Sequence, residues 1–236
     1  MIYKIVKRFF DFILSLIALI VISPLFFIII IILLLTGEHH VFYFQERIGK
    51  RGKPFYIWKF ATMLKNSANI GSKTITVRND PRILPFGRFL RKTKLNELPQ
   101  LINILKGDMS IVGPRPLVKR GFDNYTPTVR NYIIRLKPGL SGIGSVIFRD
   151  EEHYISQVKE TRLFYQTTLF PYKEKLEIWY YQHRSLYVDM MIIFLTIWVI
   201  IFPKSRLVYK IFPTLPQLDF NEAVKNFNSS TADEKS

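Results

Sequence analysis

The chain has 236 residues, of which 48% are apolar and 15% aromatic, so it is long enough for one domain with a core and too apolar to be disordered. Lysine and arginine outnumber aspartate and glutamate by 34 to 18, and the net charge of +16 predicts an anionic partner: nucleic acid, anionic lipid or a phosphorylated small molecule. Cysteine is absent, which excludes disulfides and thiolate chemistry.

The first predicted element is an apolar segment from Phe12 to Leu35 that contains no charged residue. As one helix its 24 residues would be roughly 36 Å long, enough to cross a bilayer core of about 30 Å. Two features favour instead a re-entrant hairpin that enters one leaflet and returns. Ser23-Pro24 interrupts the run, and basic residues, which prefer the cytoplasm, flank it on both sides. These flanking cations are Lys4, Lys7, Arg8, Arg47, Lys50, Arg51 and Lys53. A kinked spanning helix is the alternative, and the run is too long for a cleaved signal peptide.

Shorter patterns follow along the chain. Residues 41–45 and 55–60 predict the strands of a β-hairpin, with a turn at 49–53. Apolar residues three and four apart predict a helix from Asn96 to Leu105, and similar periodicity covers 123–136 and 155–183. The apolar run from Met190 to Phe202 is too short to span a bilayer and predicts a core helix or one lying at an interface.

The predicted class is α+β with more helix than strand. A membrane hairpin occupies residues 1–37, a mostly helical domain with a small β-hairpin occupies 38–206, and a polar tail, expected to be frayed, occupies 207–236.

Candidate phosphate-binding residues surround Glu97, which lies near the start of a predicted helix. They are Arg82, Arg88, Arg91 and Arg115. Arginine suits phosphate because its planar fork meets two oxygens and keeps its proton. Gly107-Asp108 and Gly113-Pro114-Arg115-Pro116 are sharp backbone features that could present Arg115 and free amides to a pyrophosphate. An ordinary basic surface loop is the alternative. The four histidines lack metal-ligand spacing, which argues against zinc.

Several short blocks occur in an order that resembles the bacterial sugar transferases of the monotopic phosphoglycosyl transferase family, over about residues 4–206. The blocks are Lys7-Arg8 with Asp11 and Ser15, Ser23-Pro24, Gln45-Glu46-Arg47-Ile48-Gly49, Gly52-Lys53-Pro54-Phe55, Lys59-Phe60, Asp80-Pro81-Arg82, Gly87-Arg88-Phe89-Leu90-Arg91-Lys92, Glu97-Leu98-Pro99-Gln100, Gly107-Asp108-Met109-Ser110, Val112-Gly113-Pro114-Arg115-Pro116, and Lys137-Pro138-Gly139-Leu140 with Gly142.

The resemblance implies an enzyme that transfers a sugar-1-phosphate from a UDP-sugar to polyprenyl (undecaprenyl) phosphate, releases UMP and uses Mg²⁺. It implies a monotopic protein on the cytoplasmic face of the bacterial inner membrane, anchored by the re-entrant hairpin, that initiates synthesis of capsule, exopolysaccharide or O-antigen. Membrane lipid is then a partner, nucleic acid is not, and an oligomer is compatible with the sequence. In this reading Glu97 holds Mg²⁺ or attacks the β-phosphate, the four arginines bind phosphates, and Asn96 orients them.

Asn96 departs from the family, whose catalytic pair is Asp-Glu with the aspartate as nucleophile. A neutral amide is a poor nucleophile. Three explanations remain open: Glu97 takes the role while Asn96 binds a phosphate oxygen; Asp108 or Glu177 replaces the aspartate; or the protein is impaired or altered as a trap. The rival from another class is a catalytically silent, membrane-bound scaffold or regulator of glycan assembly.

Two further departures concern the surroundings of the site. The family's Lys-Phe-Arg-Ser-Met block is Lys59-Phe60-Ala61-Thr62-Met63 here, so one cation is missing. Residues 145–149 also differ from the family, in a region expected to shape the choice of sugar.

Overall fold

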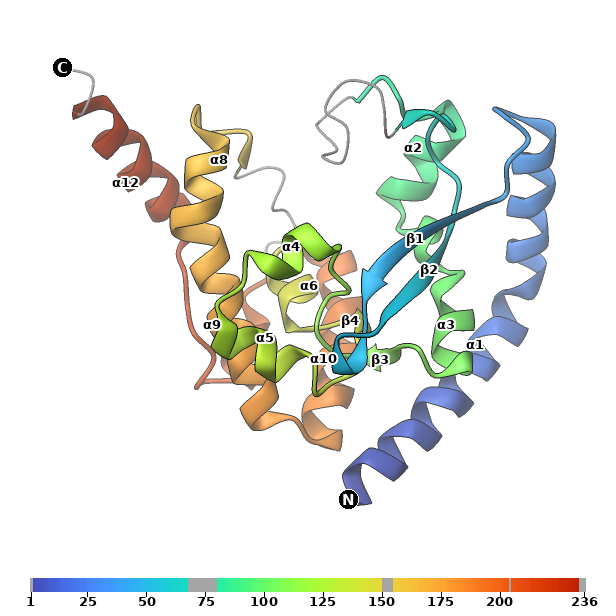
Figure 1. Cartoon of the computed structure of the whole chain (residues 1–236), viewed down its shortest axis with the longest axis horizontal. Coiled ribbons are helices and arrows are strands. Elements are labelled where there is room, and N and C mark those ends of the chain that lie inside the picture. The colour runs from blue at the N-terminus through green and yellow to red at the C-terminus, as the bar shows by residue number, and fades with distance from the viewer. Residues whose placement is uncertain (1, 68–79, 150–154, 204, 234–236) are drawn as a thin grey trace. The chain divides into compact units, whose positions relative to one another are not determined.

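The computed structural model describes residues 2–67, 80–149, 155–203 and 205–233, which divide into two compact units. The first unit consists of residues 1–49 with 53–111, and the second of residues 50–52 with 112–236. Within the described ranges the protein is mostly helical, with small two-stranded sheets and one long apolar N-terminal helix (Figure 1). The predicted balance of more helix than strand is confirmed.

Helix α1 (Ile2–Leu35) contains the whole apolar segment and is, among the described helices, the one long and apolar enough to cross a membrane. The two separate helices expected around Ser23-Pro24 are not seen, because α1 continues through both residues and only changes direction (Figure 1). Pro24 has no N–H for the carbonyl of Ile20, four residues earlier. The Ser23 hydroxyl donates to that same oxygen at 2.8 Å, so the helix bends without ending.

Polar side chains near the start of α1 tie it to the rest of the first unit. The Arg8 guanidinium donates to the carbonyls of Ile104 and Leu105 at 2.5 and 2.8 Å. Asp11 is 4% exposed and accepts from the Ser110 hydroxyl at 2.8 Å and from the Ile111 N–H at 2.9 Å. These bonds satisfy a carboxylate that burial would otherwise destabilise.

The predicted β-hairpin is present. Strands β1 (Phe42–Ile48) and β2 (Pro54–Phe60) pair antiparallel, with a register from Phe42 opposite Phe60 to Ile48 opposite Pro54. The core of the unit joins this hairpin to the last third of α1, since Ile29, Leu33, Phe60 and Leu90 form one buried cluster. Both ends of α1 therefore pack within one compact unit.

The helix predicted at 96–105 is divided in the structure. Helix α2 (Pro85–Lys92) is followed by the 3₁₀ turn η3 (Leu95–Glu97) and by α3 (Gln100–Lys106). Pro99 occupies the N-cap of α3, where its missing N–H leaves no intrahelical bond unmade. At the other end Gly107 takes the left-handed conformation (φ 92°) that commonly terminates helices.

The second unit is mainly helical. Its strand β4 (Gly139–Ser141) pairs with β3 (Ser110–Val112), whose last residue opens this unit. Its helices are α4 (Lys119–Asp123), α5 (Pro127–Ile133), α6 (Ile143–Ile147), α8 (Thr161–Phe164), the π-turn η4 (Tyr165–Leu169), α9 (Phe170–His183), α10 (Leu186–Ile201), α11 (Leu207–Ile211) and α12 (Phe220–Asp233). The helical run at 161–183 agrees with the predicted one, and α10 buries one face while Met190, Phe194 and Ile197 stay exposed on the other.

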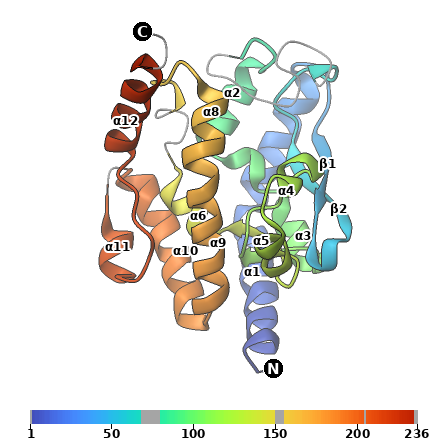
Figure 2. The same ribbon diagram turned by 60° about the vertical axis from the view of Figure 1, so that its left-hand side comes forward.

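Within the described range, which ends at residue 233, the C-terminal segment is not frayed as expected. Val208, Phe212, Leu215 and Val224 are buried, and α11 and α12 pack on the helices of the second unit (Figure 2). The segment is polar on average, but its few apolar residues recur where they meet that unit, and their burial offsets the entropy of ordering it.

Candidate active site

The turn that carries Asn96 and Glu97 has an unusual backbone. Lys94 adopts a left-handed conformation (φ 62°), and the Glu97 N–H donates to its carbonyl at 3.0 Å. Such a conformation is costly for a residue with a side chain, and strain of this kind concentrates at functional sites. Asn96 is 7% exposed, and its Oδ1 has no hydrogen-bond partner among the described residues. An unpaired buried acceptor next to a carboxylate is suited to binding a ligand.

Glu97 forms an ion pair with Lys59, whose Nζ lies 3.2 Å from Oε1. Both side chains are partly exposed, at 22% and 19% respectively. The ammonium favours the ionised carboxylate, so Glu97 is available as a base, nucleophile or metal ligand. Lys59 was given no role from the sequence; its place in the family-like Lys59-Phe60 block was the signal that could have identified it.

Asn103 explains why Lys59 lies beside this turn. Its side chain accepts from the main-chain N–H of Trp58 at 2.9 Å and donates to the carbonyl of Tyr56 at 2.8 Å. A completely buried amide on α3 thus fixes β2 from the residue before Lys59. Asn103 itself has a structural role.

Arg88 and Arg91 lie three residues apart on α2, so they share one side of a helix that packs on the Asn96–Glu97 turn. Arg88 is exposed and Arg91 is half-buried. The first unit therefore brings these two predicted phosphate ligands to the element that precedes Glu97.

Arg82 is a different case. It is 3% exposed, and its Nε and Nη2 donate to the two oxygens of Asp80 at 2.8 and 2.6 Å while Nη1 donates to the Ser67 carbonyl. This buried bidentate pair holds a bend of the chain. Arg82 is accordingly a structural residue here, and we do not retain it among the phosphate ligands. Asn79, of the predicted turn at 79–82, lies outside the described residues.

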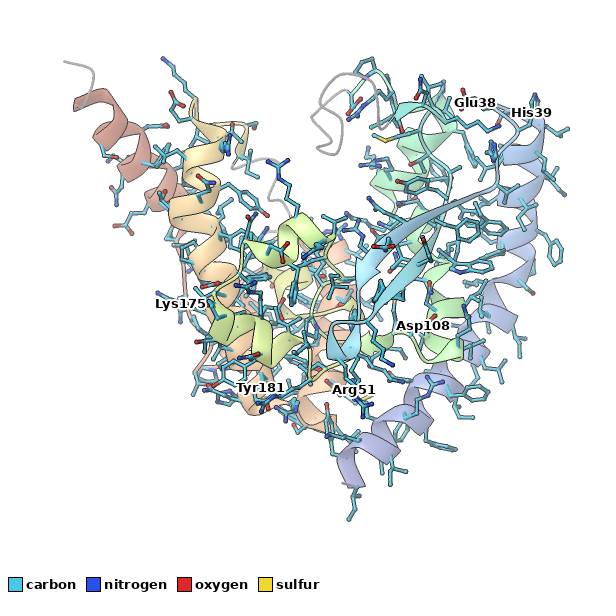
Figure 3. The ribbon with its side chains drawn as sticks, in the orientation of Figure 1. Glu38, His39, Arg51, Asp108, Lys175 and Tyr181 are labelled. Atoms are coloured by element: carbon cyan, nitrogen blue, oxygen red, sulfur yellow. The ribbon has the colours of Figure 1, made fainter. Side chains whose placement is uncertain are left out.

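Asp108 follows the end of α3, whereas Glu97 precedes its start (Figure 3). Helix α3, with seven residues and about 10 Å long, lies between them along the chain. Asp108 accepts from Asn103 at 3.3 Å and lies 3.6 Å from the Lys106 ammonium. It is therefore poorly placed to replace the missing aspartate at position 96.

Arg115 and Glu177 belong to the second unit, where Arg115 is exposed in the turn after β3. Glu177 on α9 is 8% exposed, and its carboxyl group lies near the main chain of Arg115. Burial raises the pKa of the Glu177 carboxyl to about 7, opposed by the main chain of Arg115 and by the charge of Lys173. Glu177 supports the turn that carries Arg115. This structural role differs from nucleophilic attack on phosphorus.

The residues around Glu97 fit a Mg²⁺ ion, the metal that the family implies. Mg²⁺ is usually held by one or two carboxylates together with substrate phosphates. Glu97 offers a carboxylate, and Asn96 offers an amide oxygen that no described residue satisfies. Nowhere in the described ranges do three His, Cys, Asp or Glu side chains come together, so substrate oxygens would have to complete the coordination.

The sequence is similar to known proteins over most of its length. The family described as "Bacterial sugar transferase" matches residues 2–203. An undecaprenyl-phosphate galactose phosphotransferase of Salmonella typhimurium is 34% identical over 212 residues, covering 84% of this chain and 41% of that protein. The exopolysaccharide production protein ExoY of Sinorhizobium fredii is 34% identical over 205 residues, covering 81% and 83% respectively. A UDP-glucose:undecaprenyl-phosphate glucose-1-phosphate transferase of Escherichia coli is 33% identical over 197 residues, covering 82% and 40%. This chain thus spans about two fifths of the Salmonella and Escherichia proteins.

Proposed function

Because this chain belongs to the bacterial sugar transferase family, we propose that it transfers a sugar-1-phosphate from a UDP-sugar to undecaprenyl phosphate and releases UMP. The observation that carries the proposal is the turn at Asn96–Glu97, where a reachable carboxylate is paired with Lys59 and which contacts α2, the helix that carries Arg88 and Arg91. The printed names of the Salmonella and Escherichia relatives, which specify undecaprenyl-phosphate transferases, support the substrate class. Initiation of an exopolysaccharide or O-antigen is the corresponding biological role.

In the proposed reaction the Glu97 carboxylate attacks the β-phosphorus of the UDP-sugar. An oxygen–phosphorus bond forms to Glu97, and the bond to the α-phosphate breaks, so that UMP leaves with the electron pair. An oxygen of undecaprenyl phosphate then attacks the same phosphorus and releases the Glu97 carboxylate. Two displacements replace one difficult one, and neither requires a proton from the protein.

The neighbouring side chains bind and orient the phosphates. Arg88 and Arg91 neutralise oxygens of the diphosphate, and Arg115 of the second unit is a further candidate phosphate ligand. Lys59 pairs with the Glu97 carboxylate before the substrate arrives. Its ammonium can form an ion pair with a phosphate oxygen once the substrate is bound. Mg²⁺ held by Glu97 and Asn96 oxygens would neutralise charge on the transferring group. Glu177 and Asp108 take no part in the chemistry, since one is buried near the main chain of Arg115 and the other lies at the far end of α3.

We propose further that α1 lies in the cytoplasmic leaflet and returns, with both ends on the cytoplasmic side. Two separate anchoring regions support this. Arg8 and Asp11 bind α3 and β3 near the start of α1, and Ile29 and Leu33 pack in the core of the same unit near its end. A helix that crossed the bilayer would carry one of these regions to the opposite side. Labelling of single cysteines at positions 3 and 38 in inverted vesicles tests this, and protection of one with access to the other would contradict it.

The experiment for activity measures UMP release by the purified protein in nanodiscs with Mg²⁺, undecaprenyl phosphate and a panel of UDP-sugars. Release with one sugar supports the proposal, and the panel identifies that sugar. No release with any sugar, beside an active family member under the same conditions, would contradict it.

A second candidate, a silent scaffold of glycan assembly, is favoured by the amide at position 96. Asn96→Asp separates the two. If Asn96 only orients phosphate while Glu97 attacks, the substitution changes the rate by less than about tenfold. If instead the natural chain is inactive and Asn96→Asp creates activity, the scaffold is the better description.

A further inference from the structure

The residues after the region matched by the family form a clasp over one face of α9. We call residues 205–216 the C-terminal clasp; the match ends at residue 203. The Trp179 indole N–H donates to Thr214 at 3.0 Å, and its ring lies 5.1 Å from that of Phe212. About two helical turns nearer the start of α9, the Tyr172 hydroxyl donates to the Pro216 carbonyl at 2.8 Å. The clasp thus contacts α9 at two levels about two turns apart.

A neighbouring face of α9 holds the turn that presents Arg115. Glu177 lies near the main chain of Arg115, and the hydroxyl of Tyr180, one residue after Trp179, lies 3.3 Å from the Val112 carbonyl. Tyr180 is 2% exposed and is held in turn by Asp189 of α10, whose Oδ1 lies 2.7 Å from its hydroxyl. The same short helix therefore connects the clasp to the Val112–Arg115 turn.

The turn has little freedom to follow a displaced helix. Its Gly113 N–H donates to the Ser141 carbonyl at 2.9 Å, and the Gly139 N–H donates to the Pro114 carbonyl at 2.8 Å. A Cβ at Gly113 would lie 2.4 Å from the Lys137 carbonyl, so the strands are in close contact. A shift of α9 would consequently break its contacts with the turn, because closely packed main chain does not deform continuously.

We propose that the C-terminal clasp is a positioning element for Arg115, acting through α9, and that Phe212, Thr214 and Trp179 are its positioning residues. The assignment of Arg115 to phosphate binding rests on the proposed function, but the mechanical coupling does not. The clasp lies outside the matched region and supports the Arg115 turn within the second unit.

Hydrogen exchange of the full chain in nanodiscs tests the coupling without any substrate. In the variant Phe212→Ala, we expect amides in the peptide covering residues 110–117 to exchange about fivefold faster. Phe227→Ala is the matched control, since its ring packs on Phe164 of α8 at 5.1 Å. Lys175→Ala, on the exposed side of α9, controls for a change in the helix itself (Figure 3). Both controls should leave that peptide unchanged.

Thr214→Val covers the case in which Phe212→Ala unfolds, since it removes only the hydrogen bond to Trp179. Faster exchange in the turn for Thr214→Val, with the global unfolding transition unchanged, supports the proposal. Exchange in the turn equal to that of Phe227→Ala, for both clasp variants, would overturn it.

Kinetics then connect the coupling to Arg115. We expect Thr214→Val to raise KM for the UDP-sugar about threefold, and the same substitution to have no added effect in an Arg115→Lys background. Additive effects would overturn the action through Arg115. Absence of UMP release in the unaltered protein would contradict the proposed function, whereas the exchange experiment would still decide the coupling.

Discussion

Two acidic side chains of this protein, Glu97 and Glu177, lie in opposite environments. In the first unit, Glu97 is partly exposed and lies 3.2 Å from the Lys59 ammonium. In the second unit, Glu177 is 8% exposed and its carboxyl group lies near the main chain of the turn that carries Arg115. Exposure with a cation keeps a carboxylate ionised and reachable, and burial against main chain makes it a support. The environment, more than the residue type, separates the candidate nucleophile from the structural acid.

The largest expected effect concerns Glu97. Glu97→Gln removes the charge and the attacking oxygen, so UMP release should fall about a thousandfold or more. The thermal unfolding midpoint should barely change, because a partly exposed ion pair contributes at most about 1 kcal/mol. Glu222→Gln, an exposed site on α12, is the matched control. Full activity in Glu97→Gln would exclude Glu97 as the nucleophile.

Titration of Glu177 should make the free energy of unfolding depend on pH. Its pKa is about 7 in the folded protein against 4.5 for an ordinary glutamate, so the folded state keeps a proton that the unfolded state releases. Stability should therefore decline from pH 4.5 through 7, by about 3 kcal/mol in total. Glu177→Gln cannot titrate, and its stability relative to the natural protein should rise across that range. Equal free energies of unfolding in urea at pH 5 and pH 8 would contradict the assignment.

The turns next to these two acids also differ in what their backbones require. Gly113 has no space for a side chain, since a Cβ would lie 2.4 Å from the Lys137 carbonyl. Gly113→Ala should destabilise the protein by about 2 kcal/mol, measured by urea unfolding, because neighbouring main chain must move. Gly144→Ala is the control, with nothing within 4 Å of the added methyl, and should be neutral or slightly stabilising. Equal costs at the two glycines would show that the turn is looser than described.

The smallest effect is expected at Lys94. Its left-handed backbone (φ 62°) is easier for asparagine, so Lys94→Asn should stabilise the protein by about 0.5 kcal/mol. Lys92→Asn, in the last turn of α2, should instead destabilise it slightly, because lysine is the better helix former there. A calorimetric scan of both variants compares them directly. A loss of stability in Lys94→Asn would mean that the lysine side chain has a contact worth more than the strain.

Much of the architecture could be predicted from local patterns. The β-hairpin follows from two β-rich runs around a glycine-containing turn, and the long apolar helix follows from 24 uncharged residues. The division of the predicted helix at Pro99 and the ordered C-terminal clasp were not predicted. Helix boundaries depend on where each terminal N–H and carbonyl finds a partner. The few apolar residues of a polar tail order it only when they are buried against another surface of the protein.

For the site, the sequence by itself determined the chemistry available: a carboxylate at position 97, an amide at 96, arginines nearby and no thiol. Only the tertiary structure decided which of these groups are exposed and placed to take part in that chemistry. Arg82 is bound inside the protein by Asp80, Lys59 comes from a distant strand to pair with Glu97, and Glu177 is buried against the Arg115 turn. Charge and reactivity belong to residue types, but burial and pairing depend on contacts between segments far apart in the chain, and these contacts set each group's ionisation and reach.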